Sequence, residues 1–130
     1  MSDIVEILKG KPNFHSLSGA SDELIEEAEE KLKLKFACEY RQYLAAFGAV
    51  SANGHEFTGI CEAPRLNVVD VTSFERTINS EVPMNLYVIE QANIDDIVIW
   101  QSASGEVYQS MPGAPMIKLC DSISEYINKN

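Results

Sequence analysis

The hydrophobic periodicity of the chain changes along its length, and this change limits the folds that the chain can adopt. In roughly the first 50 residues, apolar side chains recur at the spacing of amphipathic helices. After that point most apolar runs are short and bounded by turn residues, as in β-strands, and the last residues return to helical spacing. Helices followed by a block of strands predict an α+β fold, because a βαβ fold needs the two kinds of element to alternate.

Three helices are expected in the N-terminal part, at residues 3–9, from Ser21 onward, and at residues 38–47. In the second of these, Ser21 is a suitable N-cap residue. The apolar side chains that follow it form one stripe, and the glutamates between them are expected on the solvated face in i, i+4 pairs with lysines. The stripe consists of Leu24, Ile25, Ala28 and Leu32, and the pairs are Glu27–Lys31 and Glu29–Lys33.

Turn and capping residues divide the middle of the chain. Residues 13–20 are expected to form a loop, and residues 48–54 a turn with Asn53 and Gly54 at its tip. Thr72 and Glu75 have the spacing of a capping box, which predicts that a short helix begins there. The side chains expected to turn inward from this helix are Val71, Phe74 and Ile78.

Most of the strands are expected in the second half of the chain, before a closing helix. Ser122 and Glu125 form a second capping box, so a C-terminal helix should bury Ile123, Tyr126 and Ile127. The helices would then pack on a mainly antiparallel sheet of about five to six strands. The strands are expected at residues 56–60, 66–69, 86–90, 95–101, 106–109 and 116–119.

The composition is typical of one soluble domain. A chain of 130 residues has the usual size of a domain, so residues 1–130 are predicted to form a single one. No apolar run approaches the ~20 residues of a membrane helix, and the acidic N-terminus does not resemble a signal peptide. We therefore expect a cytoplasmic location and no membrane partner. Cys38, Cys61 and Cys120 have no C-x-x-C spacing and are expected to be reduced thiols.

The net charge of −10, from 20 acidic and 10 basic residues, bears on the choice of partner. An acidic surface repels phosphate groups, so direct binding to nucleic acid is disfavoured. The same surface would attract a basic protein and speed the encounter with it. Acidity that serves only solubility remains an open alternative at this point.

No recognisable catalytic or metal-binding motif occurs in the sequence. It lacks the phosphate-binding glycine loop, the nucleophile elbow and the zinc-protease motif, and it has only two histidines. His55 near Cys61 is the best candidate for nucleophilic catalysis, with Glu56 or Asp70 to orient the imidazole. Nothing in the spacing enforces that contact. We therefore expect no enzyme activity, no bound metal and no cofactor.

Two further features have both a functional and a structural interpretation. Asp95 and Asp96 could act as paired carboxylates, but adjacent residues of a strand point to opposite faces and cannot converge on one atom. One structural and one exposed carboxylate explain them better. Trp100 is either an anchor for a partner or a core residue, and inside an apolar strand the core is the more common place.

The order of these elements resembles the SUKH superfamily, which unites yeast cell-wall-assembly regulators, bacterial Syd and many bacterial immunity proteins. The resemblance covers about residues 21–127 and is strongest in Leu-Ile-Glu-Glu-Ala-Glu-Glu-Lys-Leu-Lys-Leu-Lys-Phe at residues 24–36. It continues through Glu-Tyr-Arg-Gln-Tyr-Leu-Ala-Ala-Phe-Gly at residues 39–48 and the glycine-rich turn and strand at residues 53–60. Residues 83–89, 105–108 and 122–126 resemble the family's later strand, hairpin and terminal helix.

The resemblance implies a function by binding. Bacterial members are often immunity proteins encoded beside polymorphic toxins, so we expect a non-enzymatic protein that neutralises a cognate toxin, with a basic nuclease domain as one candidate. We expect it to dock as a monomer or weak homodimer. The alternatives are a regulatory or scaffold module of the same fold that binds a housekeeping protein, and a small-molecule-binding domain. The expected partner contacts are the exposed acids of the loop-rich half, Glu56, Glu62, Glu90, Asp95 and Asp96.

Overall fold

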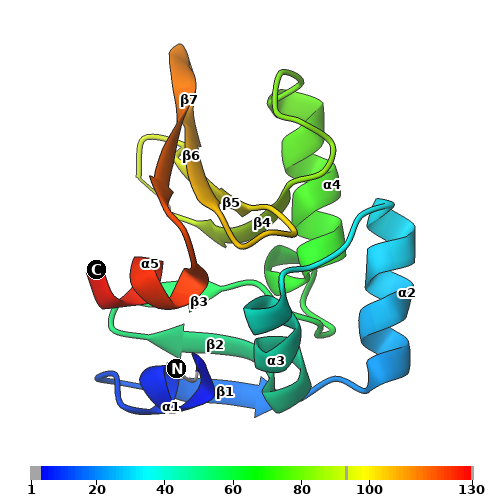
Figure 1. Cartoon of the computed structure of the whole chain (residues 1–130), viewed down its shortest axis with the longest axis vertical. Helices are drawn as coiled ribbons and strands as arrows, with labels where there is room; N and C mark the ends of the chain where they lie inside the picture. Colours follow the sequence, from blue (N-terminus) through cyan, green and yellow to red (C-terminus); the bar gives the residue numbers. More distant parts are fainter. Residues whose placement is uncertain (1–3, 93, 130) are drawn as a thin grey trace.

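The computed structural model describes residues 4–92 and 94–129, in which seven strands form one sheet. The strands follow chain order, and each pairs antiparallel with the next (Figure 1). The sheet turns strongly along its width, since β1 and β2 run across the view whereas β6 and β7 stand nearly upright. The strands are β1 (His15–Ser18), β2 (Phe47–Ala52), β3 (His55–Phe57), β4 (Tyr87–Gln91), β5 (Val98–Gln101), β6 (Val107–Met111) and β7 (Ala114–Cys120).

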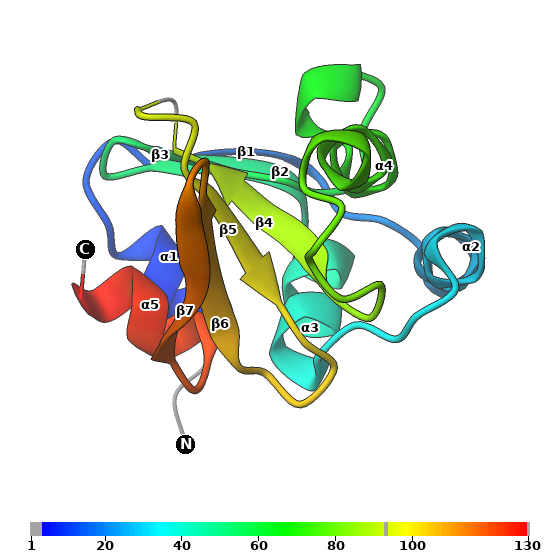
Figure 2. The ribbon, with the colours of Figure 1, turned by 90° about the horizontal axis from the view of Figure 1, so that it is seen from above.

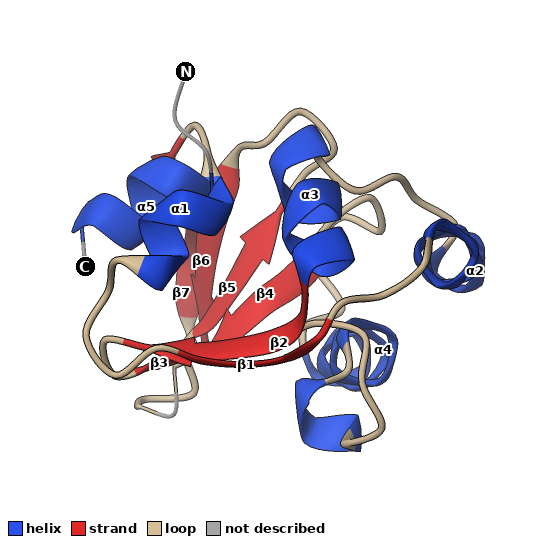
Figure 3. Cartoon of the chain, turned by 90° about the horizontal axis from the view of Figure 1, so that it is seen from below, coloured by secondary structure: helices blue, strands red, loops and turns tan. Residues whose placement is uncertain are grey.

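Helices cover both faces of this sheet (Figures 2 and 3). On one face lie α1 (Ile4–Lys9), α3 (Cys38–Ala46) and α5 (Ile123–Lys129). On the other face α4 (Val68–Ile78) packs over β4, after a short 3₁₀ helix, η1 (Pro64–Leu66). α2 (Asp22–Leu32) packs against α3 and α4. The α+β class is therefore confirmed, with one strand more than the largest number expected.

Each face of the sheet carries a hydrophobic core. The larger core joins α1, α3 and α5 to strand side chains such as Tyr87, Ile89 and Ile99. The smaller core lies between α4 and the sheet. Trp100 is fully buried there, and its indole N–H donates to Ser110 Oγ at 2.8 Å, so the core interpretation of Trp100 is confirmed. The buried residues of the smaller core are Val71, Leu86, Val88, Val98 and Trp100.

The start of α2 follows the sequence prediction closely. The Leu24 N–H donates to the side chain of Ser21 at 3.3 Å, which confirms the N-cap. Glu27 and Lys31 form the expected ion pair at 3.1 Å. Leu24, however, is 46% exposed and lies outside the buried stripe of the helix.

The prediction for Glu29 is wrong. Instead of a solvated partner of Lys33, Glu29 is only 2% exposed. The helix ends at its C-cap Lys33, whose backbone conformation is left-handed. The chain then folds back, so that the Phe36 N–H donates to the Glu29 carboxylate at 2.8 Å. Lys35 and Arg41 lie 3.9 and 3.8 Å from the same carboxylate. The turn after the helix therefore buries a glutamate that the helical pattern places at the surface.

Two strands occupy segments for which the sequence predicts a loop and a turn. β1 has four exposed side chains, so it lacks the alternation by which a strand is recognised. β2 follows α3 without a loop, because Phe47 is both the C-cap of that helix and the first residue of the strand. The hairpin tip is as predicted, with Asn53 and Gly54 at φ values of 51° and 82°.

The helix α4 begins earlier than predicted, and the face of it that packs on the sheet differs from the predicted one. The Asn67 side chain accepts the N–H groups of Val69 and Asp70, so a helix begins where a strand is predicted at residues 66–69. Phe74 and Ile78 point outward, at 58% and 60% exposed, contrary to the prediction. The buried side chains of α4 are Val68, Val71, Thr72 and Glu75.

A β-bulge in β4 decides the direction of Glu90. Val88 pairs with Trp100 and Glu90 with Ile99, so the alternation of faces shifts by one residue between them. Val88 and Trp100 face α4 in the smaller core, whereas Glu90 lies with Ile99 on the side of α5. Strict alternation would have placed Glu90 on the α4 side with Val88.

Candidate functional site

The five acidic side chains predicted as partner contacts do not form one patch. Glu56, Glu90 and Asp96 line three different hollows of the surface. Glu62 and Asp95 are exposed. Glu90 is only 3% exposed because the bulge turns it inward, so it is not one of the exposed acids that the sequence predicts.

Glu56 and the two aspartates differ in their surroundings. Both terminal guanidinium nitrogens of Arg65 donate to the Glu56 carboxylate, at 3.0 and 3.2 Å, and this pairing lowers the pKa of the Glu56 carboxyl. Asp95 and Asp96 lie in a turn with φ values of 53° and 54°, and β5 begins only at Val98. The predicted strand at residues 95–97 is therefore wrong, and both carboxylates are exposed on a left-handed turn.

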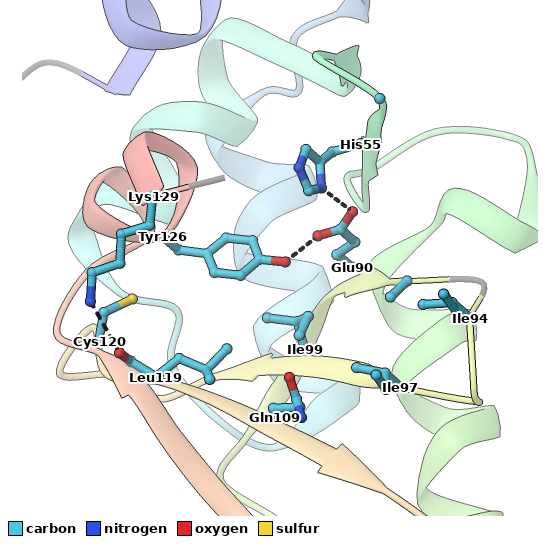
Figure 4. A pocket seen from close by; sticks show the side chains of 12 residues that line it. His55, Glu90, Ile94, Ile97, Ile99, Gln109, Leu119, Cys120, Tyr126 and Lys129 are labelled. Carbon is cyan, nitrogen blue, oxygen red and sulfur yellow. Dashed lines mark hydrogen bonds and ion pairs between the residues drawn. The ribbon is translucent and has the colours of Figure 1, made fainter.

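A buried carboxylate, Glu90, joins two elements far apart in the sequence. His55 of β3 donates its Nδ1–H to one carboxylate oxygen at 2.7 Å, and the Tyr126 hydroxyl of α5 donates to the other at 2.5 Å (Figure 4). Burial, followed by the charge of Glu90, raises the pKa of Tyr126 well above its ordinary value, so the hydroxyl keeps its proton. The His55 ring and the Tyr126 hydroxyl are therefore both held in place by hydrogen bonds to the Glu90 carboxylate.

This cluster forms the polar end of a cavity of 480 Å³ (Figure 4). Its floor is apolar and comes from β5, β7 and the loop before β5. Lys129 lies at the α5 side, where its ammonium donates to the Leu119 carbonyl at 3.4 Å. The volume is in the range of small-molecule sites. The apolar lining residues are Ala92, Ile94, Ile97, Ile99 and Leu119.

The thiols near these residues are not arranged for nucleophilic attack. Cys61 donates to the Ala63 carbonyl at 3.6 Å, while His55 is bonded to Glu90 rather than to Cys61. Cys120 lines the cavity, but burial raises the pKa of its thiol, which disfavours the thiolate. Asp70 is exposed on α4. The hydrogen bond that Cys–His catalysis needs is absent between His55 and Cys61.

A second feature, which we call the α4–hairpin groove, lies on the opposite face of the sheet. It consists of two hollows of 360 and 430 Å³ between the end of α4, the turn after it and the β6–β7 hairpin. The two hollows share Ile78, Asn79 and Pro112 and therefore adjoin. The sequence prediction missed this groove because it turned Phe74 and Ile78 inward. Recognition of Asn67 as an N-cap would have placed the start of α4 correctly, but the face of the helix that is buried depends on its packing against β4.

Among residues 4–92 and 94–129, no three His, Cys, Asp or Glu side chains gather closely enough to hold a metal ion. None of the helices that they form combines the length and the apolar character needed to cross a membrane.

The fold is that of an α+β protein in which helices cover both faces of an antiparallel sheet. A family model described as SMI1-KNR4 cell-wall, SUKH_5, matches residues 1–129, so the chain belongs to this family. The resemblance to the SUKH superfamily is thereby confirmed. No curated protein matches the chain.

Proposed function

We propose that this chain is an immunity protein that neutralises a cognate bacterial toxin by direct stoichiometric binding. Membership of the SUKH family supports a role in protein–protein interaction in general. The observation that carries the finer proposal is the exposed acidic charge. Glu62, Asp95 and Asp96 are exposed, and none of them forms an ion pair within the described residues of a chain of net charge −10.

The mechanism follows from charge complementarity. Exposed carboxylates that lack an internal partner remain available to lysines and arginines of a basic toxin domain, and they speed its approach. The bound protein then blocks the active site of the toxin or the approach of its substrate. We also propose that this action needs neither catalysis nor a cofactor, and that the protein acts as a monomer or weak homodimer.

Co-expression with the toxin domain encoded beside this chain tests the proposal. We expect host survival and a complex of 1:1 stoichiometry on co-purification. Host death, together with the failure of any neighbouring gene product to form a complex, would reject the immunity function. A tight complex with a housekeeping protein instead would favour the regulatory module.

The 480 Å³ cavity favours a second candidate function, the binding of a small molecule with an apolar body and a polar group. Native mass spectrometry of the purified protein tests it by detecting co-purified molecules. The variant Leu119→Trp, which fills the apolar floor, is the control. A mass released from the wild type but not from the variant would support ligand binding, whereas release of no molecule from the wild type would contradict it.

A further inference from the structure

The α4–hairpin groove exposes apolar side chains that a folded chain normally buries. Phe74 and Ile78 are one helical turn apart on α4, at 58% and 60% exposed. Met111, at the end of β6, is 36% exposed and faces the same hollow as Ile78. Figure 1 shows the end of α4 and the β6–β7 hairpin at the same end of the molecule. Exposed apolar side chains gathered along adjoining hollows are typical of an interaction site.

The groove also carries negative charge that the described residues do not neutralise. Glu75 is only 7% exposed, and its carboxylate accepts hydrogen bonds from the Gln91 amide at 2.5 Å and the Asn79 amide at 3.1 Å. Both donors are neutral. Within the described residues no ion pair reaches Glu75, Glu81 or Asp96, all of which line the groove.

The physical consequence is a site that favours a cation. A buried carboxylate has lost much of its hydration, and neutral amides replace only part of it. The buried Glu29, by contrast, has Lys35 and Arg41 within 4 Å. Among the described residues that line either hollow of the groove, none is a lysine or an arginine. A positive charge brought by a partner would therefore find Glu75 already desolvated and held in place.

We propose that the α4–hairpin groove binds a basic segment of the protein partner, in which lysine or arginine side chains stand next to apolar ones. The proposal rests on the proposed function, because it assumes a basic protein partner. The cation lies against Glu75, with Glu81 and Asp96 at the rim, and the apolar side chains cover Ile78 and Met111. Arginine suits the site best because its planar guanidinium binds a carboxylate through two hydrogen bonds and is enriched at interfaces.

Two other occupants fit the groove less well. A second copy of this chain would bring another net charge of −10 against an acidic groove, which opposes self-association. A compact small molecule would fill one hollow only, whereas the two hollows adjoin at Ile78, Asn79 and Pro112. An extended chain segment can occupy both.

The first experiment measures the affinity for the co-expressed toxin domain. The groove variants are Ile78→Ser and the double variant Glu81→Lys with Asp96→Lys. The matched controls are the double variant Glu6→Lys with Glu26→Lys, and Ile117→Ser, which change two exposed acids and an exposed apolar side chain that do not line the groove. Circular dichroism verifies that every variant is folded.

We expect the groove variants to weaken binding at least about tenfold and the controls to change it by less than about threefold. The loss in the charge variant should shrink as salt is added to the assay, because salt screens exposed charges. A wild-type complex that forms with equal affinity in the groove variants would overturn the groove proposal and leave the proposed function standing.

The second experiment tests binding at the groove without the toxin. An isotope-labelled sample is titrated with a short peptide of alternating arginine and leucine, and with a matched peptide of alternating glutamate and leucine. We expect amide shifts at residues 74–82 and 110–116 with the basic peptide alone. Such shifts support the groove as a binding site for a basic segment even if no toxin binds. Equal shifts with both peptides, shifts only elsewhere, or a dimer in sedimentation whose contacts cover these amides would overturn it.

Discussion

Replacing Gly59 by alanine would force a methyl group into the backbone of β2. A Cβ built at Gly59, just after β3, would lie 1.8 Å from the carbonyl oxygen of Gly48 and 2.6 Å from its carbonyl carbon. Carbon and oxygen atoms that are not bonded approach to about 3.3 Å, so one strand must move by more than about 1 Å. Because the obstructing atoms belong to the backbone, no side-chain rotation relieves the contact.

The loss of stability follows from the contact and from the hydrogen bonds around it. Overpacking of this kind costs about 1–3 kcal/mol. The Gly59 N–H donates to the Leu66 carbonyl, and the Val68 N–H donates to the Gly59 carbonyl, both at 2.7 Å. Weakening each bond adds about 1 kcal/mol. We therefore expect Gly59→Ala to lower the free energy of unfolding by about 3–5 kcal/mol, a large part of the about 5–15 kcal/mol of a typical domain.

Urea unfolding measured by tryptophan fluorescence provides the assay, because Trp100 is the only tryptophan and is fully buried. Gly10→Ala is the matched control. A Cβ at Gly10 would meet its nearest atoms at 3.6 and 3.7 Å, so the control should change stability by no more than about 1 kcal/mol. A Gly59→Ala protein whose free energy of unfolding is within about 1 kcal/mol of the wild type, with an unchanged urea slope, would refute the close approach of Gly59 to β2.

Three further predictions concern single contacts. Tyr126→Phe removes one of the donors to the buried Glu90 carboxylate and should lower the free energy of unfolding by about 1.5–3 kcal/mol in the same urea assay. Arg65→Ala should raise the pKa of the Glu56 carboxyl toward its ordinary value of 4.5, as followed by NMR titration. Since the pairing lowers the folded-state pKa, the small stabilisation by this largely exposed pair is present above pH 4.5 and is lost as the pH falls below it. Asn67→Ala removes the N-cap of α4 and should cost about 1–2 kcal/mol, measured as a lower urea midpoint.

Sequence patterns correctly predicted the features that depend only on residues close together in the sequence. The Ser21 cap and the Glu27–Lys31 pair of α2 form as expected because both contacts lie within about one helical turn. The Asn53–Gly54 turn forms because its backbone conformation suits those two residues. The C-terminal helix buries Tyr126 as its capping box and spacing predict.

The predictions failed where a distant segment decided the outcome. Val88 donates its N–H to Thr72, a residue that the sequence assigned to a helix N-terminus, and this contact becomes possible only when α4 lies on the sheet. β1 has no buried side chain and exists because β2 supplies its hydrogen-bond partners. Glu29 is buried because the chain folds back over α2.

The sequence by itself determined the α+β class, the family and the acidic charge, because composition and periodicity are properties of the residues in order. Tertiary structure alone decided which acids are available to a partner. Glu90 is buried because a bulge in β4 shifts the alternation of the strand and turns it toward His55 and Tyr126. Glu75 lies buried beside a groove because α4 packs on β4 through the face that carries Val71, Thr72 and Glu75. In both cases the neighbouring residues in the sequence leave open the face on which the carboxylate lies, and only packing against other elements decides that face.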